Sequence, residues 1–352
     1  MIPSKRMKGE PAIVLFSVDT EPDDQWSDHL GTSVHNVAGL WRFQELLDKL
    51  DVIPTYLVTH SVATNSAAMN ALATLQRNHS CEIGAHLHVW DNPPFLHDER
   101  DRQSPAFGHE LPLEHFHAKL DTLTHRIAEH FDRPTSYRAG RFGFCAEHIG
   151  VLESLGYRVD TSVTPLLDRR PKTGIPKDQG GSGGRDFRQA PLDPYFPNYR
   201  NELEPGSAAL MEVPLTAGIC GPAAAFGNAL HRYAPKWLCK SMRKLGLAKV
   251  VTASPVQFRA ADLLQLLGGA LRDGRRVFNF TLHSSETMAG GSPELQTEDD
   301  ILALFSRIRI AVEFLKDRVE ITSCPLTMLA AERESLSARE LNPQSKLIPA
   351  AI

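Results

Sequence analysis

Three short apolar segments of this chain each end in residues that bind metals or transfer protons. Ala12–Glu21 (AIVLFSVDTE) ends in two carboxylates, Cys81–His88 (CEIGAHLH) ends in two imidazoles, and Val277–Glu286 (VFNFTLHSSE) contains His283 and a terminal glutamate. In a fourth segment, Ser136–Gly143 (SYRAGRFG), Gly140 lies between Arg138 and Arg141, and the segment ends at Gly143. In parallel α/β folds and barrels, ligands and catalytic groups gather beyond the carboxyl ends of the strands. These four segment ends therefore predict one shared site in an enzyme.

Two pairs of residues within these segments have the spacing of metal ligands. Side chains at i and i+2 of a strand share one face, so Asp19 and Glu21 can point together, and so can His86 and His88. This mixture of oxygen and nitrogen donors suits zinc or another divalent first-row ion. The acidic pair alone is equally well explained as a solvated turn. Two histidines on an apolar strand need partners when buried, so the two pairs together favour a metal.

His283 and Arg138 add acid–base chemistry to this set. His283 ends an apolar segment and can be a third ligand, a general acid or a packed core residue. Arg138 lies in a segment that looks buried, where an unpaired guanidinium is costly. We expect its partner to be a site carboxylate that it holds ionised as a base. The alternative for Arg138 is a surface position over the glycine turn.

Strand-like and helical segments alternate along the chain, which is typical of a parallel sheet with crossover helices. Seven or eight strand candidates favour a closed barrel over an open sheet. The predicted strands are Ala12–Glu21, Thr55–His60, Glu82–His88, Ser136–Ala139, Tyr157–Ser162, Leu210–Thr216, Arg276–His283 and Val319–Cys324. The predicted helices are Val37–Leu50, Ala67–Leu75, Leu113–Phe131, Cys145–Leu155, Ala229–Leu245, Val256–Leu271 and Glu298–Lys316.

Two long segments, about 91–111 and 165–206, interrupt the alternation. Loops of this length are either functional lids or disordered. The lid interpretation is favoured for the parts with Trp90, Tyr195 and Tyr199. Residues 1–10 and 337–352 are expected to be poorly ordered tails.

Composition excludes several classes of protein. A formal charge of −4 and a pI near 6.4 give no excess of positive charge of the kind that binds nucleic acid. Five widely spaced cysteines form no CxxC pair, which fits a reducing compartment. We expect no signal peptide and no transmembrane segment, so the cytoplasm is the predicted location. The motifs of serine hydrolases, dinucleotide enzymes and zincins are absent from the sequence.

With these residues in hand, the chain resembles the polysaccharide deacetylase (NodB-homology, carbohydrate esterase family 4) superfamily, and within it the WalW-like branch. SVDTEPD, EIGAHLHVW, YRAGRFG, YRVDTSV and TLHSSE resemble five family motifs in the family's order. The resemblance implies a distorted (β/α)7 barrel of NodB type, formed by a single deacetylase domain over residues 11–330 with long loop insertions at the strand C-terminal face. Two departures are visible: Asp19-x-Glu21 replaces adjacent aspartates, and Trp90 stands where common members have their second metal histidine.

The resemblance also implies roles for individual residues in removing an N-acetyl group from a sugar or saccharide precursor. Glu21, His86 and His88 would hold a divalent metal, with zinc preferred over cobalt or manganese. Asp19 would be the base, His283 the acid, Arg138 the partner of Asp19, and Asp160 would orient His283 or a neighbour. Trp90, Arg141, Phe142 and Gly143 are the expected substrate contacts, and the backbone near Arg141–Gly143 would stabilise the oxyanion.

Two alternative functions remain open at this point. A deformylase or cyclic-amide hydrolase would use the same constellation of residues. A non-catalytic carbohydrate-binding or assembly protein would also fit the departure at Trp90. All three hypotheses share a carbohydrate or related small-molecule ligand, and the sequence carries no indication of oligomeric state.

Overall fold

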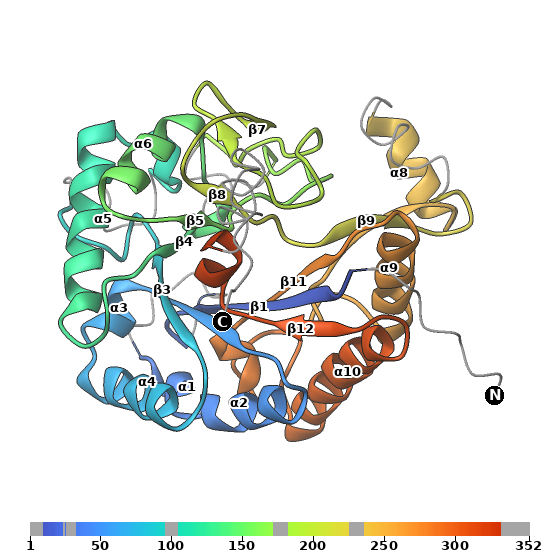
Figure 1. Ribbon diagram of the computed structural model, residues 1–352, viewed down its shortest axis with the longest axis horizontal. Coiled ribbons are helices and arrows are strands. Elements are labelled where there is room, and N and C mark those ends of the chain that lie inside the picture. Colours follow the sequence, from blue (N-terminus) through green and yellow to red (C-terminus); the bar gives the residue numbers. More distant parts are fainter. Residues whose placement is uncertain are drawn as a thin grey trace, which may run out of the picture.

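A single curved sheet organises the molecule, and its strands run in parallel. The computed structural model describes residues 10–23, 25, 33–95, 105–171, 182–224 and 236–331. The strand order is β11-β1-β2-β3-β4-β5-β8, and β12 pairs with the first part of β1 (Figure 1). The strands of this sheet are β1 (Ala12–Thr20), β2 (Pro54–Val58), β3 (Glu82–Leu87), β4 (Ser136–Ala139), β5 (Val159–Asp160), β8 (Met211–Glu212), β11 (Val277–His283) and β12 (Ile321–Ser323).

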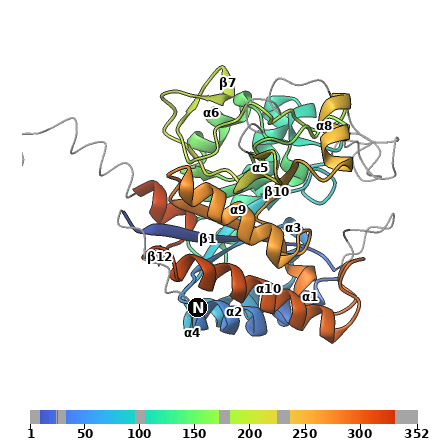
Figure 2. The same ribbon diagram turned by 90° about the vertical axis from the view of Figure 1, so that its right-hand side faces the viewer.

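Helices between successive strands cover the outer face of this sheet. They are α1 (His35–Ala38), α2 (Leu40–Lys49), α3 (His60–Ala63), α4 (Ser66–Asn78), α5 (Leu113–Ala128), α6 (Ala146–Ser154), α9 (Ala260–Arg272) and α10 (Glu298–Lys316). Figure 2 shows α9 and α10 lying together on the flank of the barrel. The even-numbered residues Val14, Phe16 and Val18 of β1 belong to the main hydrophobic core. Burial of these apolar side chains against the helices stabilises the outer layer.

The odd-numbered residues of β1 face the opposite way and change character along the strand. Leu15 packs in a small apolar cluster with Val159, Met211 and Val277, and this cluster includes residues of the 324–330 segment after β12. Ser17 and Asp19, further along the same face, are buried polar residues. The interior is therefore apolar at one end and polar at the carboxyl ends of the strands.

The barrel closes through individual hydrogen bonds between β11 and two segments that follow β8 in the chain. The backbone N–H of Thr216 donates to the Asn279 carbonyl at 3.1 Å, and that of Thr281 donates to the Ala253 carbonyl at 3.0 Å. No ladder between β8 and β11 occurs among the described strands. The seven parallel strands on the path from β11 to β8, together with the irregular closure, form the distorted (β/α)7 barrel that the sequence predicts.

Two insertions follow the strand ends where the sequence predicts them, and a third was not foreseen. The 91–111 and 165–206 segments follow β3 and β5; residues 96–104 and 172–181 lie outside the described part. Within the second segment, β6 (Pro197–Asn198) and β7 (Asn201–Pro205) form a small antiparallel pair. The unforeseen insertion pairs β9 (Ala217–Cys220) with β10 (Lys249–Thr252).

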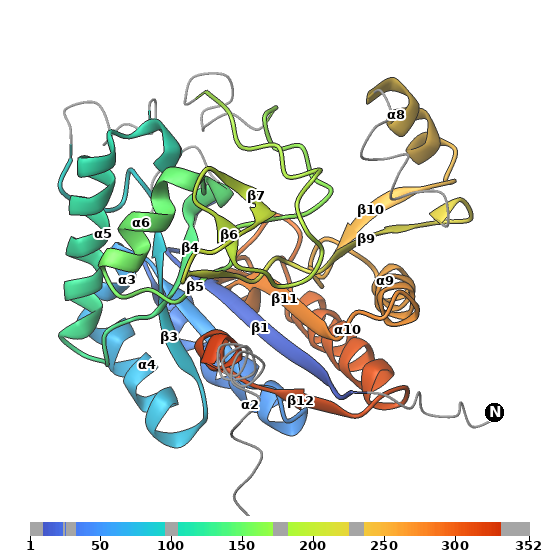
Figure 3. The ribbon, with the colours of Figure 1, turned by 45° about the horizontal axis from the view of Figure 1, so that its top comes forward.

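Only part of the predicted helix Ala229–Leu245 can be compared with the structure. Helix α8 (Lys236–Lys244) is present, whereas residues 225–235 are not described. Figures 1 and 3 show β9, β10 and α8 projecting beside α9, away from α5 and α6. The expected tails 1–10 and 337–352 lie outside the described residues, apart from Glu10.

Two further expectations concern the whole chain. All five cysteines are described, and none forms a disulfide. Within the described ranges, no helix combines the length and apolarity needed to cross a membrane.

Candidate metal and acid–base site

Glu21 lies one residue beyond the end of β1, and neighbouring segments fix its backbone. Its N–H donates to Ser284 Oγ at 3.1 Å, and its carbonyl accepts from Asn36 Nδ2 at 3.0 Å. The side chain is only 3% exposed. Burial raises the pKa of Glu21, although the charges of His283 and His86 oppose that effect. The carboxylate is therefore held in an environment that favours a nearby cation.

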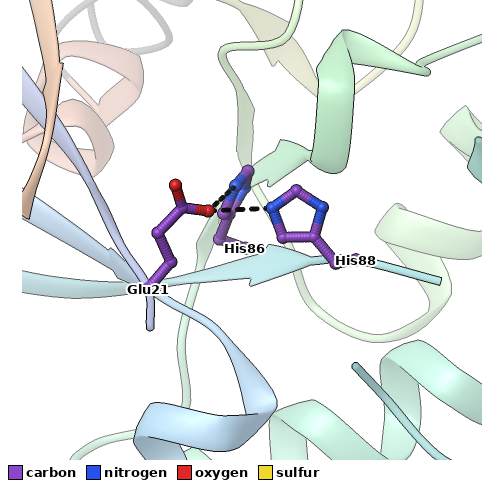
Figure 4. Close-up of side chains that lie close together, drawn as sticks. All are labelled: Glu21, His86 and His88. Carbon is purple, nitrogen blue, oxygen red and sulfur yellow. Dashed lines mark hydrogen bonds and ion pairs between the residues drawn. The ribbon is translucent and has the colours of Figure 1, made fainter. Parts of the chain in front are cut away.

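His86 and His88 bring two imidazole rings to the same carboxylate oxygen. Figure 4 shows Glu21 directed at both rings. The Oε2 atom of Glu21 lies 2.9 Å from His88 Nε2 and 3.7 Å from His86 Nε2. A side chain at Gly140 would obstruct this arrangement, because a Cβ there would come 2.6 Å from His88 Nδ1. Glycine at 140 therefore leaves room for the His88 ring.

A hydrogen bond of His86 Nδ1 fixes the tautomer of this ring. Nδ1 lies 3.0 Å from the carbonyl oxygen of Arg138, so it carries the proton and donates it. The Nε2 lone pair then faces Glu21. Burial lowers the pKa of His86 to about 4, despite the opposing charges of Asp19 and Glu21, so the ring is neutral near pH 7. A lone pair facing a carboxylate is unfavourable unless a cation lies between them.

These three residues fit a divalent metal ion. Their ligand atoms all lie within 4.8 Å of one another, and all three side chains are buried. Ligand atoms around a tetrahedral zinc with bonds near 2.0–2.1 Å are about 3.3 Å apart, close to the distances measured from Glu21. A neutral imidazole whose second nitrogen donates to a carbonyl is also the usual form of a histidine ligand. The donor set suits zinc and is compatible with cobalt or manganese.

Asp19 lies two residues before Glu21 on the same face and forms an ion pair with Arg138. Arg138 Nη1 lies 2.5 Å from Asp19 Oδ1, and both side chains are almost completely buried. The remaining guanidinium donors reach Ser17, Thr161 and Thr281. Burial alone would raise the pKa of Asp19, but Arg138, followed by His86 and His283, lowers it to about 2. Asp19 is therefore ionised at neutral pH.

His283 ends β11 and completes the group. Its Nε2 lies 3.9 Å from Asp19 Oδ2 and 3.8 Å from Glu21 Oε1, while Nδ1 lies 3.2 Å from Glu286 Oε2. Burial would lower the pKa of His283, but the charges of Glu286, Glu21 and Asp19 together raise it to about 10. The ring is therefore protonated and surrounded by carboxylates. Its side chain is 26% exposed, so a proton donor of the site is accessible to solvent.

Sequence reasoning did not assign a role to Glu286, although a local signal was present. Glu286 Oε2 accepts the backbone N–H of His283 at 2.7 Å, as well as contacting its ring. A carboxylate three residues after the N-cap, the residue that precedes a helix, is the spacing of a capping box. This spacing at His283-Ser-Ser-Glu286 could have identified Glu286 as the residue that holds His283.

The sequence predicts that Asp160 orients His283 or a neighbour, and the structure places Asp160 on the opposite face of the sheet from His283. Its strand neighbours face the barrel interior: Val159 belongs to the inner apolar cluster, and Thr161 Oγ1 accepts from Arg138. Because side chains alternate along a strand, Asp160 is directed to the other face. There it accepts from Ser162 Oγ at 2.6 Å, and it is hydrogen-bonded to Glu212, its register neighbour on β8.

Of the four expected substrate contacts, Trp90 packs against the His88 ring, and the other three lie in the turn that follows β4. Trp90 is only 7% exposed; its ring centroid lies 4.3 Å from that of His88 and 4.6 Å from the Arg141 guanidinium carbon. Phe142 lies near Arg138, whose guanidinium carbon is 5.9 Å from the ring centroid. The N–H of Gly143 donates to the Gly140 carbonyl, so it is already engaged and is not a free oxyanion donor.

Known structures share this fold at low sequence identity. A candidate polysaccharide deacetylase from Mycobacterium smegmatis superposes with a TM-score of 0.52 at 14% identity, covering 99% of this chain and 96% of that one. A candidate glycoside hydrolase/deacetylase from Parabacteroides distasonis gives 0.56 at 11% identity, covering 94% and 71%. No protein-family model and no curated protein matches the chain. At these identities the likeness concerns the fold alone, and the predicted distorted (β/α)7 barrel is confirmed.

Proposed function

We propose that this protein is a metal-dependent hydrolase that removes an N-acetyl group from a sugar or saccharide precursor. The observation that carries the proposal is the convergence of Glu21, His86 and His88 within 4.8 Å, next to an ionised Asp19. The fold shared with candidate polysaccharide deacetylases agrees with it. A divalent ion held by the three ligands would polarise the acyl carbonyl and lower the pKa of water.

Asp19 is the proposed general base. Its Oδ1 is engaged by Arg138, whereas Oδ2 is directed toward the space shared with His283. With a pKa near 2, Asp19 is ionised across the neutral range and can accept a proton from the attacking water. Arg138 keeps this carboxylate in one position while proton transfer occurs.

His283 is the proposed general acid. Its Nε2 lies between Asp19 and Glu21, and its raised pKa keeps the ring protonated before reaction. Cleavage of the C–N bond requires a proton on the departing amine, which Nε2 would supply. Glu286 on Nδ1 would hold the ring in position during this transfer and stabilise the imidazolium.

The decisive experiment measures metal content and released product with the same protein. Protein purified without chelators is analysed for zinc, cobalt and manganese, then incubated with N-acetyl sugars while acetate is quantified. His86→Ala should lose both the metal and acetate release, because it removes a ligand. Formate release or ring opening would instead support the alternative hydrolases. Bound metal with no turnover of any of these substrates would favour the non-catalytic alternative.

Two broader expectations remain proposals. Residues 11–330 form a single domain, consistent with one hydrophobic core that spans β1 to α10. A cytoplasmic location agrees with five cysteines that form no disulfide, since a reducing compartment keeps thiols reduced. The ligand would then be an intracellular saccharide precursor. Export of the active protein in a native host would contradict this location.

A further inference from the structure

Arg169 lies next to the candidate site and has no role in the chemistry described above. It follows β5, in the long segment that leads away from the strand end. Its guanidinium carbon lies 4.0 Å from the centroid of the Phe142 ring. The guanidinium carbon of Arg138, which holds Asp19, lies 5.9 Å from the same centroid. The Phe142 ring therefore connects Arg169 to the Asp19–Arg138 pair.

Other arginines of this region have carboxylate partners. Arg170 pairs with Asp186 at 2.8 Å, Arg188 pairs with Asp186 at 2.7 Å, and Arg185 pairs with Glu202 at 2.5 Å. Among the described residues, no carboxylate lies within ion-pair distance of Arg169. Unlike these neighbouring arginines, Arg169 therefore has no negative side chain beside it in the described part to compensate its charge.

Most hydrogen-bonding capacity of the Arg169 guanidinium is unused. Nε donates to Thr164 Oγ1 at 2.7 Å, and this is the only side-chain hydrogen bond of Arg169 within the described ranges. No partner of the two terminal nitrogens occurs in the described part of the chain, and the Arg169 residue is only half-buried. Burial lowers the pKa of Arg169 to about 10, which still leaves the side chain charged at neutral pH. A cation with open donors is thus held at the edge of the site.

The turn that carries the Phe142 ring, which Arg169 contacts, has an uncommon backbone conformation. Phe142 has φ 60° and Arg141 has φ 54°, in the left-handed region that side-chain-bearing residues rarely adopt. Such strained conformations cluster at ligand-binding and active sites. This turn directs the Phe142 ring to both guanidinium groups. The strained turn therefore carries the aromatic ring that Arg169 contacts.

We propose that Arg169 binds an anionic group, a carboxylate or a phosphate, carried by the acetamido sugar. This inference rests on the proposed function and specifies its substrate class. A planar guanidinium with two open nitrogens matches the oxygens of either group through paired hydrogen bonds. The charge of Arg169, which no neighbouring carboxylate in the described part compensates, would favour anionic over neutral sugars.

Binding to metal-free protein separates this proposal from catalysis. The probes are N-acetylglucosamine, N-acetylglucosamine 1-phosphate and the uronic acid of N-acetylglucosamine, titrated calorimetrically. Wild type should bind at least one anionic probe about 10- to 100-fold more tightly than the neutral sugar, as expected for a charge-assisted pair. The stronger anionic probe identifies phosphate or carboxylate as the natural group.

Variants of Arg169 and a matched arginine complete the test. Arg169→Gln should remove the preference for the anionic probe. Arg169→Lys should keep part of that preference, because lysine has the positive charge but not the planar guanidinium that donates paired hydrogen bonds. Arg188→Gln, at a paired arginine of the same segment, should keep the preference. If Arg169→Gln does not fold, the wild-type ratio of affinities decides the question, since equal binding of all three sugars overturns the proposal.

The outcome also distinguishes this inference from the proposed hydrolysis. Acetate release from a neutral acetamido sugar, together with equal affinities for the three probes, would reject the anion-binding role of Arg169 and leave the hydrolase proposal intact. Selective binding of an anionic probe that Arg169→Gln abolishes, with no acetate release from any sugar, would support the anion site and reject the hydrolase.

Discussion

The barrel holds two pairs of buried carboxylic acids that differ in how their charge is compensated. Asp19 and Glu21 face the interior at the end of β1, where Arg138, His86, His88 and His283 surround them. Asp160 and Glu212 lie side by side on the outer face of β5 and β8. No ion pair to Asp160 or Glu212 occurs among the described residues. Burial is therefore similar in the two pairs, but the positive groups are on one side of the sheet.

This difference determines the protonation state of each pair. Attraction by Arg138 lowers the pKa of Asp19 to about 2 in spite of burial. Burial, followed by the charge of Asp160, raises the pKa of Glu212 well above its ordinary value, so Glu212 keeps its proton and donates it to Asp160. The inner pair is available for acid–base and metal chemistry, whereas the outer pair is a hydrogen bond between two strands. A buried acid is thus informative about function only together with its counter-charges.

The largest effect expected from this comparison is on catalysis at the inner pair. Asp19→Asn keeps the shape of the side chain but removes the base, so turnover should fall by about 10²–10⁴-fold. The metal should remain, because Glu21, His86 and His88 are unchanged. Steady-state acetate release and metal analysis of the same sample measure both quantities. An equal loss of metal would reassign Asp19 as a ligand.

Removing the counter-charge of Asp19 should strongly reduce stability. Arg138→Met leaves Asp19 buried without its partner, which costs about 3–5 kcal/mol of unfolding free energy for pairs of this kind. Denaturant unfolding measures this loss. The double variant Asp19→Asn/Arg138→Met should recover part of it, because no unpaired charge remains. Additive losses in the double variant would show that the pair is not coupled.

A smaller effect, on the pH dependence of stability, is expected at the outer pair. Because the folded-state pKa of Glu212 is raised, wild type loses about 1.4 kcal/mol per pH unit as pH rises from the ordinary glutamate range toward the folded pKa. Glu212→Gln can still donate to Asp160 and does not titrate. Its stability relative to wild type should therefore increase between pH 5 and 7. Parallel stability curves for Glu212→Gln and wild type would contradict a shared proton.

The smallest effect expected is that of Asp160 on turnover. Asp160→Asn keeps one oxygen that can accept from Ser162 and gains an amide that can donate to Glu212, and it lies on the face away from His283. We expect acetate release to fall by less than about tenfold, against about 10²–10⁴-fold for Asp19→Asn. A loss as large as that of Asp19→Asn would restore Asp160 to the catalytic group and would remove the distinction between the two pairs.

Much of the inner site could be predicted from local sequence alone. Residues two apart on a strand share a face, so the pairs Asp19/Glu21 and His86/His88 were predictable without coordinates. Apolar segments of strand length also located β1, β3, β4 and β11 to within about two residues. A buried arginine needs a partner, and the ion pair expected for Arg138 forms with Asp19.

Tertiary structure decided which face of a short strand is the inner one. β5 has only the two residues Val159 and Asp160, too few to reveal an alternating pattern, so the sequence could not indicate that Asp160 faces outward. The β9–β10 pair and the approach of Arg169 to Phe142 likewise depend on long-range packing. Local periodicity fixes the relative direction of neighbouring side chains. Only the closed barrel fixes which direction meets the metal ligands and which meets another strand.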